Sequence, residues 1–227
     1  MYSVISGDIV SSTSLSQKDR EKLEYALATV LKELEAEYST FGRIIKGDYV
    51  ECVVPDASKG LRVALAIKSY VKTIDIDISE YTDTKSLAKL FKQIGIRLAI
   101  GYGELKRFEP EKGIVDGPAI YRSGRAISGK SNHDKERVVI KNTLFFISEN
   151  EALDATFKAI FELLDVLLNK ATARQCEVVF HKLLGKNEDA IASLLGINQS
   201  VVNQHSTSVG WNAIETAVNY FESTLKA

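Results

Sequence analysis

Cysteine is scarce in this chain of 227 residues: Cys52 and Cys176 stand alone and far apart in the sequence. Their spacing excludes a disulfide framework and the paired cysteines of a zinc site. Histidine is equally rare, and His133, His181 and His205 have no partner at the spacing of metal ligands. We therefore expect all three histidines to be surface or partly packed residues.

The sequence also lacks long apolar runs and an excess of charge. No apolar stretch approaches the roughly 18 residues of a membrane-spanning helix, and no basic segment followed by an apolar core stands at the N-terminus. With 45% apolar residues, 26% charged residues and a net charge of −1, the composition is that of a globular protein. We therefore expect a cytoplasmic protein without a membrane partner.

Positive charge is missing where nucleic-acid binding would need it. Residues 1–150 carry 23 Lys and Arg against 21 Asp and Glu, whereas residues 151–227 carry 6 against 9. Because a DNA-binding module usually presents a basic surface, this C-terminal balance argues against strong autonomous DNA binding.

Hydrophobic periodicity predicts elements in the order β-α-β-β-α-β, then α-β, and then helices to the end of the chain. The first six elements have the order of a ferredoxin-like fold, in which the first strand lies centrally beside the hairpin. We therefore predict an α+β fold with an antiparallel sheet, and a Gly-rich loop from Pro110 to Pro118. The expected strands are Tyr2 to Ile9, Phe41 to Ile45, Tyr49 to Val54, Ile94 to Gly101 and Arg137 to Lys141.

Two acidic turns are the most informative feature of the sequence. Asp8 follows the first expected strand and leads into a loop of hydroxyl residues, and Asp48 lies at the turn of the expected hairpin. The ferredoxin-like order brings the two turns side by side. Neighbouring carboxylates repel each other unless a cation lies between them, and Mg²⁺ or Mn²⁺ with phosphate oxygens would satisfy both. The loop N–H groups of Ser11, Ser12 and Thr13 could bind that phosphate, although Gly-Asp pairs are also ordinary turn residues.

Four segments resemble those of class III nucleotidyl cyclases, in the order that the family has them. Gly7 to Thr13 is similar to the first metal-binding segment, and Ile45 to Asp48 is similar to the second. Ile96 to Gly103 resembles the next strand, and Gly117 to Arg125 resembles the helix start that carries the transition-state residues. The likeness spans about residues 1–145, and small bacterial SatD-like proteins have a similar layout.

The resemblance implies that Asp8 and Asp48 are ligands of two Mg²⁺ or Mn²⁺ ions and that the ligand is a purine nucleotide. It also implies that Arg125 stabilises the charge on a transferring phosphoryl group across a homodimer. A guanidinium suits that role because it is planar and always charged.

Three departures from the family pattern predict a degenerate site. Ile44 and Ile114 stand where the family has polar residues that read the base, and Tyr121 stands where it has an asparagine. Apolar side chains have no hydrogen-bonding group for a base edge. Polar neighbours that could substitute are Lys46, Arg43 and Asp116. The candidate ligand-binding residues are Ser11, Ser12, Thr13 and Lys46.

The C-terminal segment has the register of a helix-turn-helix. Ala190 lies in the first helix, Gly196 at the tight turn, and Ser200 early in the second helix. Asn and Gln can read adenine in the major groove, but no Lys or Arg lies between Lys186 and Lys226 to bind phosphate. A helical hairpin that packs or dimerises is therefore an open alternative. The candidate DNA-contacting residues are Gln199, Ser200, Asn203 and Gln204.

These features predict two domains, a cyclase-like domain of residues 1–147 and a helix-turn-helix domain of residues 148–227. The leading hypothesis is a cytoplasmic transcriptional regulator, acting as a homodimer. Its degenerate cyclase-like domain would bind a metal–phosphate nucleotide ligand, and its helical domain would contact DNA. The alternatives are an active purine nucleotidyl cyclase and a protein-interaction module without chemistry.

Overall fold

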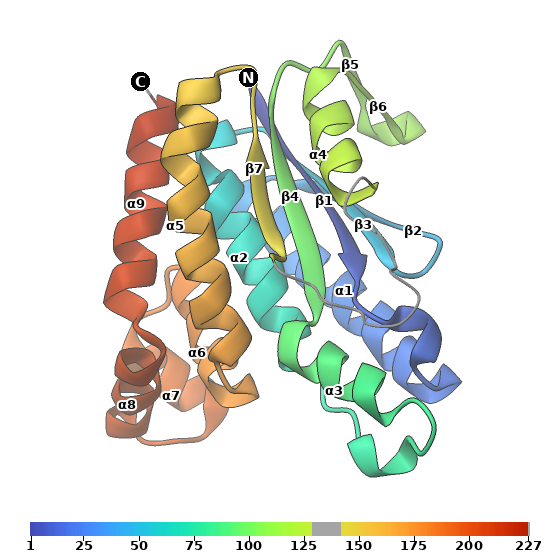
Figure 1. Ribbon diagram of the computed structural model, residues 1–227. Helices are drawn as coiled ribbons and strands as arrows, with labels where there is room; N and C mark the ends of the chain where they lie inside the picture. The colour runs from blue at the N-terminus through green and yellow to red at the C-terminus, as the bar shows by residue number, and fades with distance from the viewer. Residues whose placement is uncertain (129–141, 227) are drawn as a thin grey trace.

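The computed structural model describes residues 1–128 and 142–226 (Figure 1). The central sheet of this described part contains β1 (Tyr2–Ile9), β2 (Phe41–Ile45), β3 (Tyr49–Val54), β4 (Ile96–Gly103) and β7 (Leu144–Ile147). The strands lie in the order β2-β3-β1-β4-β7, with β1 antiparallel to both of its neighbours. The order of the first four strands confirms the ferredoxin-like arrangement that the sequence predicted.

The sheet is mixed, and the prediction of a wholly antiparallel sheet was wrong. β7 pairs parallel with β4, with Ile147 opposite Gly101. Between these strands the chain forms α4 (Pro118–Ser128), which packs on the sheet. A helix that connects two strands in this way returns the chain in the same direction, so the strands are parallel. The strand expected from Arg137 to Lys141 lies outside the described residues.

The Gly-rich loop predicted from Pro110 to Pro118 is instead part of a two-stranded antiparallel ribbon. Phe108 in this ribbon packs edge to face against Tyr2 and Phe41, with ring centroids 5.9 Å apart in both pairs. Strands of three residues are too short to show a hydrophobic period, which is why the sequence pattern missed them. The ribbon consists of β5 (Arg107–Glu109), the 3-10 helix η4 (Pro110–Lys112) and β6 (Ile114–Asp116).

Helices cover both faces of the sheet. α1 (Gln17–Tyr38) and α2 (Gly60–Val71) lie on one face and α4 lies on the other (Figure 1). Along β1, Ile5 belongs to the core shared with α1 and α2, whereas Val4 packs with α4. Because side chains alternate between the faces of a strand, Asp8 shares the parity of Val4 and lies on the α4 face.

The segment after β7 is helical, as predicted, and it packs against the sheet. Phe146 in β7 contacts Phe157 and Phe221, with ring centroids 5.0 Å and 5.5 Å apart. Buried side chains from both sides of the predicted domain boundary between 147 and 148 form one continuous cluster. No helix in the described ranges is both long and apolar enough to span a bilayer. The remaining helices are α3 (Lys85–Ile94), α5 (Glu151–Lys170), α6 (Ala173–Leu183), α7 (Glu188–Leu195), α8 (Gln199–Val209) and α9 (Trp211–Lys226).

α2 is enclosed between the sheet and the C-terminal helices. All of its residues are buried except Arg62 and Tyr70. Tyr70 packs on Phe180 of α6, with ring centroids 4.8 Å apart. The carboxylate of Glu222 in α9 accepts hydrogen bonds from Arg62 and Lys59, both at 2.6 Å. A helix that is covered all round in this way is mostly apolar on every side, and its two charged residues, Arg62 and Lys68, are each paired with a carboxylate.

Candidate functional site

The end of β1 meets the turn of the β2–β3 hairpin. Asp8 lies opposite Tyr49 in the register of β1 and β3, and the Ile9 N–H donates a 3.0 Å hydrogen bond to the Asp48 carbonyl. The Ser12 hydroxyl donates to the Asp48 carboxylate, with 2.6 Å between Oγ and Oδ2. The fold therefore brings Asp8, Asp48 and Ser12 to one place.

The loop after β1 has the backbone shape of an anion-binding nest. Ser11 adopts the left-handed conformation (φ 57°, ψ 28°), and the 3-10 helix η1 (Ser12–Ser14) follows it. A left-handed residue followed by right-handed ones turns successive N–H groups toward one concave side. Within residues 1–128 and 142–226, the N–H groups of Ser11, Ser12 and Thr13 have no hydrogen-bond partner. A non-glycine residue in this conformation is uncommon and marks the loop as a candidate binding segment.

Sequence reasoning missed the partner of Asp8, which is Arg97. The two residues lie directly opposite each other in the register of β1 and β4. The guanidinium donates to both carboxylate oxygens: Nε lies 2.9 Å from Oδ1, and Nη2 contacts Oδ2. Bidentate pairs of this kind are among the strongest hydrogen-bonded contacts in proteins. The signal in the sequence was a single charge in an otherwise apolar strand, between Ile96 and Leu98.

A pair of divalent ions does not fit these carboxylates as they lie. Both oxygens of Asp8 accept from Arg97, and the described residues contain no cluster of three or more His, Cys, Asp or Glu able to hold a metal. Asp48 differs, because only its Oδ2 has a partner in the described chain, the Ser12 hydroxyl. A single Mg²⁺ or Mn²⁺ beside Asp48 does fit, since Mg²⁺ commonly takes one carboxylate together with phosphate oxygens.

The hairpin turn adds one exposed cation to this end of the sheet. Lys46 is exposed and left-handed (φ 56°), and its amino group has no hydrogen-bond partner among the described side chains. Gly47 follows at φ 80°, and a Cβ built there would lie 3.0 Å from Glu24 Oε1 of α1. The turn therefore requires glycine at this position, and Lys46 is available to an anion.

Arg125 lies on the exposed side of α4, and it forms no hydrogen bond or ion pair within the described part of the chain. One turn earlier, Tyr121 donates a hydrogen bond to Asp116 of β6, and this bond is the main cause of its raised pKa. Ser123 on the same helix contacts β1, with its Oγ 2.8 Å from Ser6 Oγ. α4 is thus fixed over the sheet while Arg125 faces outward.

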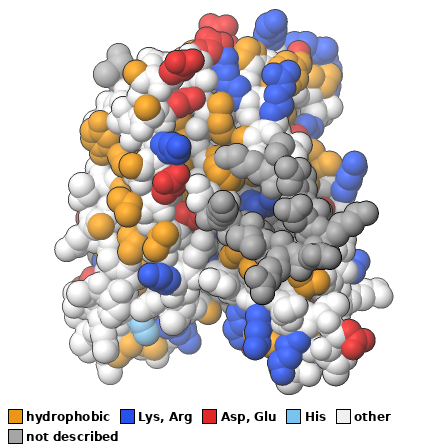
Figure 2. Space-filling model, in the orientation of Figure 1, with side chains coloured by type: hydrophobic (Ala, Val, Ile, Leu, Met, Phe, Trp, Pro, Cys, Tyr) orange, Lys and Arg blue, Asp and Glu red, His pale blue; other side chains and the backbone are white. Residues whose placement is uncertain are grey.

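The four candidate DNA-contacting residues lie on the exposed side of α8. Gln199 is tied to α7, because its Nε2 donates to Glu188 Oε2 at 2.6 Å. Val202 of α8 packs with Ile191 of α7 in a small cluster that also includes Val178 of α6. On the face shown in Figure 2, Lys and Arg side chains gather over α3 and over the β5–β6 ribbon rather than over α8. DNA contact stays a prediction for Gln199, Ser200, Asn203 and Gln204.

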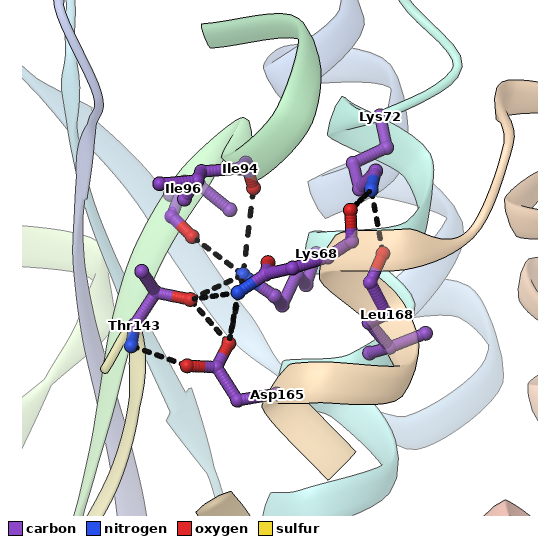
Figure 3. A network of polar contacts seen from close by, with 8 residues as sticks. Lys68, Lys72, Ile94, Ile96, Thr143, Asp165 and Leu168 are labelled. Carbon is purple, nitrogen blue, oxygen red and sulfur yellow. Dashed lines mark hydrogen bonds and ion pairs between the residues drawn. The ribbon is translucent and has the colours of Figure 1, made fainter. Parts of the chain in front are cut away.

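A second polar cluster lies inside the protein, where α2 and α5 meet the starts of β4 and β7 (Figure 3). The Lys68 amino group donates to Thr143 Oγ1 at 2.7 Å and to the Ile96 carbonyl at 3.1 Å, and lies 3.5 Å from Asp165 Oδ1. The Asp165 carboxylate accepts from the Thr143 N–H at 2.6 Å. Burial lowers the pKa of Lys68 to about 8. Because protein groups surround both charges, this cluster is a structural element.

The chain is distantly similar to solved structures of bacterial adenylyl cyclases. Two of these, both described as a bacterial light-regulated adenylyl cyclase, match 64% of this chain with 14% sequence identity and a TM-score of 0.42. The matched region spans 42% of each cyclase chain. No protein-family model matches the chain, and a search of curated proteins found no significant match.

Proposed function

We propose that the protein binds the phosphate chain of a purine nucleotide, together with Mg²⁺ or Mn²⁺, at the end of β1 and acts as a regulatory protein. The observation that carries this proposal is the nest of N–H groups at Ser11, Ser12 and Thr13 beside the Asp48 carboxylate. The N–H groups would receive phosphate oxygens, and Asp48 would hold the accompanying cation. Lys46 would add a positive charge from the neighbouring turn.

Three features favour binding over turnover. Arg97 engages both oxygens of Asp8, the first of the two expected metal ligands. Tyr121, at the position of the expected asparagine, donates to Asp116 of its own chain. Ile44, at a base-reading position, is half-buried against the core and offers the base no hydrogen bond.

The proposed regulatory role requires partners that respond to the ligand. Arg125 faces outward from α4 without a partner in the described chain, which suits a contact with a second copy across a homodimer. We keep DNA at α8 as the proposed target, although the absence of Lys and Arg from that helix means that other elements would have to bind the phosphates.

Thermal melting of the full chain with Mn²⁺ and either ATP or GTP tests the proposal. Ligand at about 100 times its Kd adds roughly 2.7 kcal/mol to the free energy of unfolding, which raises the Tm by about 5–10 °C. We expect Ser11→Val to abolish this rise, because a β-branched residue strongly disfavours the left-handed conformation of the nest. Asp48→Ala should reduce the rise by removing the ligand of the cation.

Ser39→Val is the matched control, since Ser39 is also left-handed (φ 53°) but ends α1 instead of forming the nest. This variant should lower the Tm of the free protein as Ser11→Val does, yet retain the rise with nucleotide. If neither nucleotide moves the Tm of the wild type, the proposal is wrong.

Adding Asp8→Ala to these samples separates the two alternatives. Cyclic nucleotide that forms with the wild type and disappears with Asp8→Ala would establish an active purine nucleotidyl cyclase. Indifference to every nucleotide, together with unchanged partner binding in Asp8→Ala and Asp48→Ala, would favour a protein-interaction module.

A further inference from the structure

Arg97 lies where a metal cation would have to bind in order to neutralise the charge of the Asp8 carboxylate. It projects from β4 onto the same face of the sheet, and its guanidinium binds both oxygens of the carboxylate. The Arg97 side chain is 11% exposed and that of Asp8 is 26% exposed. The guanidinium is therefore held within the sheet surface and is not a mobile group that leaves the carboxylate free.

One divalent ion gives the charged groups at this end of the sheet a net positive charge. Asp8 and Asp48 carry one negative charge each and Arg97 carries one positive charge, so the three groups together are negative. One divalent ion makes them positive, as phosphate binding requires. A second ion at Asp8 would lie against a guanidinium of the same sign, and arginine stays protonated in proteins, so it has no means of relieving that repulsion.

The position left for a cation is at Asp48. Its Oδ2 accepts from Ser12, and its Oδ1 has no partner in the described chain. Because Ser12 also belongs to the nest, a cation there would lie next to the phosphate that the nest receives.

We infer that Arg97 takes the place of one divalent cation, so that the site binds a nucleotide phosphate with a single Mg²⁺ or Mn²⁺ at Asp48. This inference rests on the proposed function, because it concerns the same phosphate site. It assigns Arg97 as the residue that sets the number of metal ions, a role that the sequence pattern did not reveal.

Mn²⁺ binding to the full chain, followed by electron paramagnetic resonance with and without ATP, tests the inference. The wild type should bind one Mn²⁺ per chain with ATP. Arg97→Gln should gain a second Mn²⁺ site at least about tenfold tighter than any second site in the wild type. Adding Asp8→Asn to Arg97→Gln should remove that gain, because Asp8 would be the ligand of the second ion.

Two further variants keep the outcome clear if Arg97→Gln weakens the fold. Arg97→Lys preserves the positive charge and should keep the second site weak. Arg122→Gln is the matched control, since Arg122 is paired with Glu149 and the Tyr102 carbonyl away from the two aspartates. Its Mn²⁺ binding should stay within about twofold of the wild type.

The outcomes separate this inference from the proposed function. Two Mn²⁺ ions per wild-type chain with ATP would overturn the inference and leave nucleotide binding standing. Absence of nucleotide binding would refute the proposed function, and the titration with Mn²⁺ alone would still decide the role of Arg97. An Asp8-dependent gain in Arg97→Gln would then support that role, and equal Mn²⁺ binding in both proteins would overturn it.

Discussion

The Lys68–Asp165 pair in the core and the Arg97–Asp8 pair at the end of β1 each join a basic residue to an aspartate, but their surroundings differ. Lys68 is fully buried and Asp165 is 4% exposed, and both also bond to Thr143. Asp8 is 26% exposed and lies one loop away from N–H groups that have no partner in the described chain.

The surroundings of an ion pair, more than the pair itself, therefore indicate its role. A buried pair whose remaining hydrogen-bonding groups are satisfied by protein has no group to offer a ligand. A pair that borders unpartnered donors and an available carboxylate oxygen does. The first arrangement holds elements together, and the second is suited to binding.

The largest loss of stability should come from breaking the buried Lys68–Asp165 pair. Asp165→Ala leaves Lys68 without its carboxylate in the core, and breaking such a buried pair costs about 3–5 kcal/mol. Urea unfolding of the wild type and the variant measures this loss. Asp75→Ala is the control, because its pair with Lys92 is exposed, at 95% and 50%, and should cost less than about 0.5 kcal/mol. Equal losses in Asp165→Ala and Asp75→Ala would mean that burial does not make the Lys68–Asp165 pair more important for stability than an exposed pair.

A smaller effect should appear in how the contribution of Lys68 to the free energy of unfolding changes with pH. Burial lowers its pKa from 10.5 to about 8 in the folded chain. Between these pH values the unfolded chain holds a proton that the folded chain has released, so the contribution of Lys68 to stability rises with pH. We expect the wild type to gain about 2–3 kcal/mol over Lys68→Met between pH 7 and 10.5.

Comparing the two proteins removes the opposing effect of groups that do not interact with Lys68. Burial raises the pKa of Cys52 to about 12, so its contribution to stability falls as the pH rises, but it does so in both proteins. A difference in unfolding free energy that stays constant from pH 7 to 10.5 would contradict the prediction.

The smallest loss of stability should come from breaking the Arg97–Asp8 pair at the end of β1. Asp8→Asn keeps the shape of the side chain and removes the charge that Arg97 pairs with, in a region that water reaches. We expect a loss of about 1–2 kcal/mol in urea unfolding, well below that of Asp165→Ala. A loss as large as that of Asp165→Ala would mean that the Arg97–Asp8 pair is structural.

The long elements of the fold could be predicted from the sequence, because a hydrophobic period repeated over several turns identifies the buried side. α1, β1 and the helices after β7 were found in this way, and β2 and β3 were found from the Gly47-Asp48 turn between them. β7 was not, since its four residues show no period and its partner β4 lies far away in the sequence. Pairing between distant strands is a property of packing that a local pattern does not contain.

At the site, the sequence indicated that the Asp8 and Asp48 turns would meet, because the order of the elements is enough for that inference. It did not indicate that Arg97 would face Asp8, since this depends on the register of β1 against β4. Lys68 and Asp165 stood among mostly apolar neighbours, Lys68 after Ile67 and Asp165 between Leu164 and Val166. That pattern signals a buried partner, but only the packing of α5 against α2 identifies it.

The enclosure of α2 has a consequence for the order in which the chain acquires its structure during synthesis. The helix leaves the ribosome early, with an apolar surface on both sides, while the groups that cover its outer side, such as Phe180 and Glu222, are made much later. Until then that surface is exposed to the solvent, and exposed apolar surface on nascent chains is what chaperones bind and what promotes aggregation. Translation must therefore proceed well past β7 before the first half of the protein reaches its final stability.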